Sequence, residues 1–274
     1  MKVDKLRTVI IYIIIILLGL VCLLPLLNIV AISFSSSAAV EGNMVGLIPV
    51  GFSTAAYKKI LEDSQFWHSF LISVERVVLA LIINFVLIVL MAYPLSKTNA
   101  QFRGRNIYAN LMIFAMLFNG GMIPTFLVVK SYGLLNTVWA LVLPGAVPIF
   151  NVILVMNFFA AVPKELEEAA FIDGANPLQV LTKIFIPISK PVLATVSLFS
   201  IVGSWNDFFW PFLVTNNPAM YTIQVGLKQF KFANETLFAP MMAGATISAL
   251  PMFILFFALQ KYFMEGVTIG AVKG

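Results

Sequence analysis

Six long apolar runs constrain this chain more than any other feature of its sequence. An α-helix needs about 20 mostly apolar residues to cross a bilayer core of roughly 30 Å, and each run reaches that length. Because six such helices occupy most of the 274 residues, no separate soluble domain has room to exist. The predicted spans cover residues 9–33, 69–93, 107–129, 138–160, 191–214 and 238–260.

The composition excludes the soluble classes of protein. Apolar residues make up 61% of the chain and charged residues 11%, against roughly 45–50% and about 25% in soluble globular proteins. Disorder, a disulfide scaffold and nucleic-acid binding are therefore excluded as primary interpretations. With a single cysteine, Cys22, and a single histidine, His68, no metal site is predicted. We expect an all-α, multi-pass protein of the lipid bilayer.

The first apolar run is preceded by Lys2, Lys5 and Arg7, as the apolar region of a secretory signal is preceded by basic residues. At residues 9–32 it is longer than the 7–15 residues usual for a signal, so we predict a retained first helix. Lysine and arginine number eleven in the segments on the side of the N-terminus and five on the other side. The positive-inside rule then places both termini in the cytoplasm.

This topology defines three regions. Residues 1–68 hold the first transmembrane helix and an external segment, with a short surface helix near residues 55–61. Residues 69–260 form the transmembrane core, which contains a cytoplasmic loop at 161–190. Residues 261–274 form a cytoplasmic tail.

Catalytic motifs are absent from the sequence. It contains no G-x-x-x-x-G-K-[ST] phosphate loop, no H-E-x-x-H and no G-x-S-x-G. Within the spans the ionisable residues are Glu75, Arg76 and Asp207. This pattern is typical of a conduit, and we predict that the chain is not an enzyme.

The cytoplasmic loop carries a helix–glycine–helix pattern. Pro163 suits a helix start, Glu165, Glu167 and Glu168 complement the helix dipole, and Gly174 permits a turn with positive φ. Asn176 caps a second helix with Pro177 in its first position. The residues expected on its apolar face are Leu178, Leu181, Ile184 and Phe185, and Pro187 and Pro191 are expected to end it. Because anionic headgroups would repel the acidic first arm, a protein partner is favoured over the lipid surface.

Glu168-Ala169-Ala170, Gly174 and Ile184-Phe185-Ile186-Pro187 resemble the E-A-A…G…I-x-L-P loop of ABC importer permeases, with Ile186 in place of Leu. Residues 92–97 and 205–211 are similar to further motifs of carbohydrate-type permeases. The ending at 261–274 is similar to that of the branch that imports complex oligosaccharides, including uronides, so an acidic substrate fits. The resemblance covers essentially the whole chain.

The resemblance implies the type I importer fold in a bacterial cytoplasmic membrane. It implies a sister permease, an ABC ATPase dimer that binds ATP and Mg²⁺, an extracytoplasmic solute-binding protein and an oligosaccharide substrate. No cofactor is implied for this chain. Coupling to the ATPase is implied for Glu168, Ala169, Ala170, Asp173, Gly174, Ala175, Leu178, Ile184 and Pro187, and tail contact for Gly270, Lys273 and Gly274.

Polar and aromatic side chains in the outer halves of the spans are candidates for the substrate pathway. A carboxylate at membrane depth is expected to face a pore or a polar partner. The alternatives are an interfacial aromatic belt and a structural hydrogen-bond network. The candidates are Asn206, Asp207, Trp205, Trp210 and Asn119, of which Asn119 lies in a predicted helix interruption before Pro124.

An ion-gradient-coupled secondary transporter is the alternative function. It would require inverted repeats and ionisable pairs at the midplane, and the sequence offers neither clearly. An assembly subunit would leave the cytoplasmic hairpin without a role.

Overall fold

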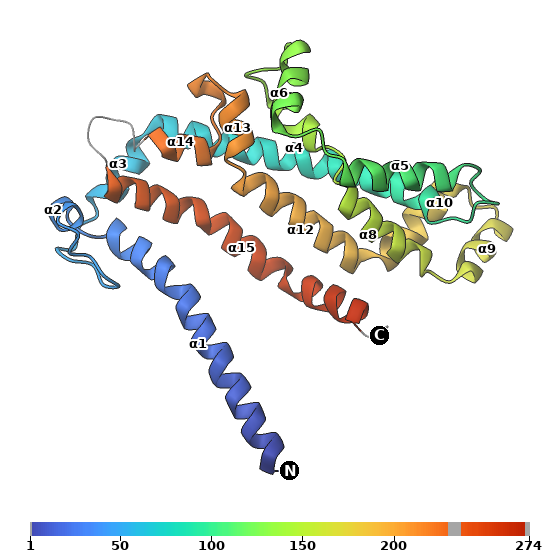
Figure 1. The fold of residues 1–274 in the computed structure, drawn as a ribbon, viewed down its shortest axis with the longest axis horizontal. Helices are drawn as coiled ribbons and strands as arrows, with labels where there is room; N and C mark the ends of the chain where they lie inside the picture. Colours follow the sequence, from blue (N-terminus) through green and yellow to red (C-terminus); the bar gives the residue numbers. More distant parts are fainter. Residues whose placement is uncertain (1, 230–236, 272–274) are drawn as a thin grey trace. The chain divides into compact units, whose positions relative to one another are not determined.

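The fold was analysed in a computed structural model, which describes residues 2–229 and 237–271. Within these residues all regular structure is helical (Figure 1). The helices of the first half are α1 (Lys2–Ser33), α2 (Ser37–Glu41), α3 (Ala55–Glu62), α4 (Ser64–Leu95), α5 (Arg105–Leu117), α6 (Met122–Ser131), α7 (Val138–Val142) and α8 (Ile149–Ala160). Those of the second half are α9 (Lys164–Ile172), α10 (Pro177–Val180), α11 (Ile186–Ile188), α12 (Lys190–Asn206), α13 (Phe209–Val214), α14 (Ile223–Gln229) and α15 (Phe238–Ala271).

In the part of the chain that the structure describes, three helices are each long and apolar enough to cross a membrane. They are the parts of α1, α4 and α15 at Arg7–Ser33, Ser64–Leu95 and Phe238–Gln260. Three further pairs of helices pass the same test only when both members are taken together, because each pair is bent. If every pair crosses as one broken span, the number of spans is six, as predicted from the apolar runs.

The bends fall where the backbone cannot continue a helix. The predicted third span is bent by 109° between α5 and α6, at the interruption expected around Asn119 (Figure 1). The predicted fourth span is bent by 48° between Val138–Gly145 and Ile149–Ala160, which was not foreseen. Pro144 and Pro148 flank this bend, and proline lacks the N–H that a helix interior needs.

The predicted fifth span, residues 191–214, is also not one helix. It consists of α12 and α13, separated by Asp207 and Phe208. Asp207 has an extended backbone at the end of α12, with ψ at 123°. At its N-terminal end, α12 follows the segment Pro177–Ile188 with a bend of 84° between them.

The described residues divide into two compact units. The first unit comprises residues 2–70, 225–229 and 237–251. In it the predicted external segment folds back on the end of α1: Asn28 Nδ2 donates to the Gly46 carbonyl at 2.7 Å, and the Ser33 and Tyr57 hydroxyls lie 2.9 Å apart. The expected surface helix is α3, whose Ile60 is fully buried.

The second unit comprises residues 71–224 and 252–271. Its larger core cluster joins the second half of α4 to α8, α12 and the segment after α10. A smaller cluster joins the first half of α4 within this unit to α6, α7 and α13. The core therefore runs along α4, which contributes to both clusters.

Gly226 of α14 lies against Ser69 near the start of α4, so a larger residue at position 226 tests the packing of the first unit. A Cβ on Gly226 would lie 2.8 Å from Ser69 Oγ and 3.0 Å from Ser69 Cβ. We expect Gly226→Ala to lower the free energy of unfolding by about 1–3 kcal/mol, the usual cost of overpacking. The measurement is denaturation of the purified chain in detergent.

Gly203→Ala is the matched control, since a Cβ on this helical glycine of α12 meets nothing within 4 Å. It should stabilise the chain by roughly 0.5–1 kcal/mol, because alanine favours the helix. Equal stability of the two variants would contradict the close packing.

Candidate functional site

The first arm of the predicted cytoplasmic hairpin is α9. It begins after Pro163 and carries Glu165 and Glu167 in its first turn, where negative charge is favourable. It ends as predicted: Gly174 has φ at 81°, and the N–H of Ala175 donates to the carbonyl of Ala170 at 2.9 Å. The sequence therefore predicted both ends of this arm.

The second arm begins with a complete capping box. The Asn176 side chain accepts from the N–H of Gln179, and the Gln179 side chain accepts from the N–H of Asn176, both at 2.9 Å. Pro177 occupies the first turn of α10, as expected. A π-helical turn at Leu181–Phe185 follows α10, and α11 then ends at Ile188.

The apolar face predicted for the second arm is wrong in one position. Leu181 and Phe185 are buried and Ile184 is half-buried, but Leu178 is 62% exposed and Val180 takes its place in the core. The π-helical turn that follows interrupts regular α-helical spacing along this arm, because its hydrogen bonds run from residue i to i+5.

The outer surface of the hairpin combines acidic and apolar side chains. Glu168 is exposed on α9 three and four residues before the exposed apolar side chains of Phe171 and Ile172, and Leu178 is exposed on the second arm. Ile172, at 86% exposure, contacts little else within the described part of the chain. The remaining predicted coupling residues are exposed at Ala169, Asp173, Gly174 and Pro187 and half-buried at Ala170, Ala175 and Ile184.

The inner surface of the hairpin carries an ion pair that sequence reasoning missed. Glu167 is 8% exposed, and its carboxylate accepts a hydrogen bond from Lys97 Nζ at 2.7 Å. The Tyr93 hydroxyl donates to the same carboxylate at 3.3 Å. The sequence predicts only a contribution to the helix dipole for Glu167 and a partner contact for its neighbour Glu168. A lysine just past the end of a long helix was the available signal.

Aromatic rings complete the surroundings of Lys97. Its Nζ lies 4.2 Å from the ring centres of both Tyr93 and Phe185, within the range of cation–π attraction. Burial lowers the pKa of Lys97 from its usual value, while the hydrogen bond and the charge of Glu167 act in the opposite direction. The cluster joins α4, α9 and the π-helical turn.

A second ion pair joins α4 to the break in the predicted fifth span. Arg76 Nη2 donates to Asp207 Oδ2 at 2.6 Å, and the two side chains are 6% and 28% exposed. The same guanidinium donates to the carbonyls of Leu141 at 3.2 Å and Ser204 at 3.1 Å. Arg76 thus holds α7, the last turn of α12 and Asp207 together.

The other pathway candidates are not gathered around one point by the described contacts. Trp210 Nε1 donates to the Ala140 carbonyl at 2.8 Å, and Trp205 is buried. Asn206 is exposed and donates to the Val202 carbonyl within its own helix. Asn119 is exposed and accepts from the N–H of Gly121 in its own loop. These contacts favour the structural alternative for Asp207 and Trp210.

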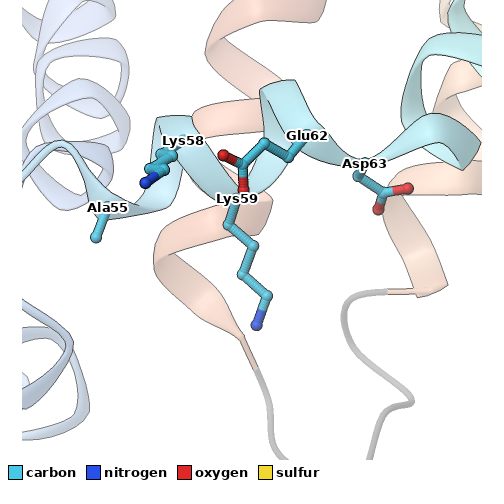
Figure 2. A pocket seen from close by; sticks show the side chains of 5 residues that line it. All are labelled: Ala55, Lys58, Lys59, Glu62 and Asp63. Atoms are coloured by element: carbon cyan, nitrogen blue, oxygen red, sulfur yellow. The ribbon is translucent and has the colours of Figure 1, made fainter.

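The predicted external segment carries an open hollow of about 420 Å³ along α3 (Figure 2). Lys58, Lys59, Glu62 and Asp63 line it together with Ala55. Two positive and two negative side chains nearly cancel, so this surface gives no strong preference for the charge of a ligand.

Two predicted features lie at the edges of the described structure. Gly270 belongs to α15, which continues through residue 261 to Ala271, whereas Lys273 and Gly274 lie outside the described residues. Among the residues described, no group of three or more His, Cys, Asp or Glu side chains is placed to hold a metal ion.

The chain is similar in sequence to known membrane transport proteins. Residues 48–269 match the family described as "Binding-protein-dependent transport system inner membrane component". Protein LplC of Bacillus subtilis is 40% identical over 93% of this chain and 91% of its own length. The polygalacturonan/rhamnogalacturonan transport system permease protein YtcP of the same organism is 38% identical over 99% of both chains.

A solved structure is similar over nearly the same length. It belongs to a bacterial ABC transporter involved in the import of the acidic polysaccharide alginate. The matched chain is 33% identical, with a TM-score of 0.87, and the alignment covers 96% of this chain and 98% of that one.

The Arg76–Asp207 pair predicts a loss of stability when one partner is neutralised. We expect Asp207→Asn to lower the free energy of unfolding by about 3 kcal/mol, because the buried guanidinium loses its counter-charge. The loss falls at the lower end of the range for buried pairs, since Asp207 is 28% exposed. Denaturation of the detergent-purified chain measures it.

Asn206→Ala is the control on the neighbouring residue. Its side chain is exposed and bonded within its own helix, so the change should cost less than about 1 kcal/mol. An Asp207→Asn variant as stable as Asn206→Ala would show that Arg76 does not depend on the pair.

Proposed function

Because this chain belongs to the family of binding-protein-dependent transport system inner membrane components, we propose that it forms one half of a heterodimeric pore. It is a permease subunit of an oligosaccharide ABC importer and a multi-pass component of the cytoplasmic membrane. Permease subunits of such importers are not enzymes, and ATP is hydrolysed by a separate subunit. Membership of this family removes the ion-gradient-coupled alternative.

The cytoplasmic hairpin couples the pore to the ATPase. The observation that carries this assignment is its division into two faces, with Val180, Leu181 and Phe185 anchored in the core while Glu168 and Ile172 project outward. An exposed apolar surface beside a fixed acidic group suits a hydrophobic groove with a basic rim. In this proposal Glu168 pairs with a basic side chain of the ATPase, and Phe171, Ile172 and Leu178 enter its groove.

The partners and the orientation follow the same proposal. A sister permease completes the pore, an ATPase dimer with bound ATP and Mg²⁺ receives the hairpins, and an extracytoplasmic binding protein delivers the substrate. The distribution of lysine and arginine supports cytoplasmic termini. The apolar side chains of α1 from Val9 to Leu27 are exposed in the single chain, which leaves them available to lipid or to the sister subunit.

The substrate in this proposal is an acidic oligosaccharide that contains uronic acid residues. Two similar proteins support this class: the relative named for polygalacturonan and rhamnogalacturonan transport, and the solved transporter described for alginate import. Both are similar over almost their full length.

The substrate class predicts the outcome of a competition experiment. In cells whose uptake of a labelled oligogalacturonide depends on this chain, excess unlabelled oligogalacturonide should reduce the uptake at least tenfold. A maltodextrin of equal length should leave it unchanged, because it lacks the carboxylates. Inhibition by the maltodextrin alone would overturn the acidic class and leave the permease assignment intact.

The hairpin assignment predicts a loss of ATPase binding when Glu168 is reversed in charge. With Glu168→Lys, recovery of the ATPase with the tagged permease should fall at least about tenfold, as expected when one partner of an interfacial charge pair is lost. The measurement is affinity purification from native membranes in mild detergent, with quantitative mass spectrometry of the proteins recovered.

Glu165→Lys is the matched control, since Glu165 is also exposed on α9 but lies one turn nearer its start. It should leave ATPase recovery within about twofold of the parent. Recovery of the ATPase by Glu168→Lys at the parental level would place the contact elsewhere.

A further inference from the structure

Two neighbouring glutamates of α9 lie on different faces of the helix. Glu168 is exposed on the side proposed to meet the ATPase, whereas Glu167 is 8% exposed and turned toward Lys97. Adjacent residues on a helix point to different faces. A short helix therefore presents one carboxylate outward and fixes the next one to the transmembrane core.

The inward contact is stronger than a surface ion pair. Lys97 Nζ and Glu167 Oε2 are 2.7 Å apart, both side chains are largely buried, and the Tyr93 hydroxyl donates to the second carboxylate oxygen. Two aromatic rings enclose the ammonium group. Separating partly buried charges leaves both without compensation, so the hairpin cannot move away from Lys97 without a large cost.

Backbone hydrogen bonds continue from the end of α4 to Lys97. The helix ends at Leu95, but the N–H of Ser96 still donates to the Ala92 carbonyl at 2.9 Å, and the N–H of Lys97 donates to the Pro94 carbonyl at 3.2 Å. From Arg76 to Lys97 the rise of an α-helix gives a length of roughly 30 Å, enough to cross the bilayer core.

The other end of this length of α4 carries the second ion pair. Arg76 binds Asp207 and the Ser204 carbonyl at the break between α12 and α13. Between the two ends, Asn84 lies within 3.4 Å of Ser200 Oγ in α12. One continuous helix thus links the inner face of the hairpin to the interruption in the predicted fifth span.

We infer that Lys97 and Glu167 are positioning residues for coupling: their ion pair transfers movement of the hairpin to α4, and α4 delivers it to the Arg76–Asp207 pair. The inference rests on the proposed function, since it requires the hairpin to be moved by an ATPase. A purely stabilising pair would affect folding and assembly but not the amount of sugar carried for each ATP hydrolysed.

The test uses the full importer, with binding protein, reconstituted in proteoliposomes. Transport of a labelled mixture of oligogalacturonides and maltodextrins and hydrolysis of ATP are measured in the same vesicles. The variants are Lys97→Met, which retains the aliphatic stem, Glu167→Gln, which is nearly isosteric, and the reversed pair Lys97→Glu with Glu167→Lys. The controls are Lys183→Met and Glu165→Gln, which are exposed on the same hairpin.

We expect Lys97→Met and Glu167→Gln to assemble with the ATPase and hydrolyse ATP while the sugar carried for each ATP falls about tenfold, within the usual range of coupling between sites. The reversed pair should recover part of this ratio, and the controls should keep it. If Lys97→Met fails to assemble with the ATPase, Glu167→Gln decides the test. The amide oxygen of its glutamine can still accept a hydrogen bond from Lys97, so this variant should assemble.

A parental ratio of sugar to ATP in Glu167→Gln would overturn the inference, as would an equal fall in both rates with the ratio unchanged. Failure of the proposed function gives a different result. In that case the unsubstituted chain itself would recover no ATPase and carry no sugar.

Discussion

The guanidinium of Arg76 joins three parts of the chain that are far apart in sequence. It donates to the Leu141 carbonyl, the Ser204 carbonyl and the Asp207 carboxylate. Lipid offers no hydrogen bonds, so backbone groups released at a helix break must be satisfied within the protein. Arg76 does this at the end of α12, and its own charge is balanced by Asp207. The irregular helices around α4 depend on this side chain.

The hairpin formed by α9, α10 and α11 likewise has a buried ion pair that joins segments distant in sequence. Its inner side places Glu167 against Lys97 and Tyr93 and its apolar residues in the core, while its outer side remains exposed. Neither side alone would serve the coupling that we propose. A hairpin without an anchored face could move independently of the core. A hairpin without an exposed face would have no surface for the proposed contact with an ATPase.

Much of the hairpin followed from its sequence because short-range rules govern it. Pro163, Gly174 and Asn176–Pro177 set the ends of its arms through φ angles and caps that involve only nearby residues. The burial of Val180 in place of Leu178 did not follow, because Val180 lies in a core cluster with residues of α4, α8 and α12 that are distant in sequence. The ion pair of Glu167 was missed for a similar reason, since Lys97 is 70 residues away.

The sequence by itself determined the all-helical class, the apolar runs, the two-armed hairpin and the family, because hydrophobic length, capping and motif spacing are written locally along the chain. Only the tertiary structure decided which charges meet. Arg76 is buried while its charged neighbour Glu75 is exposed, and Glu167 is buried while the chemically identical Glu168 is exposed. Which one is buried depends on the rotation of a helix against its neighbours, and that rotation is fixed by packing between segments distant in sequence.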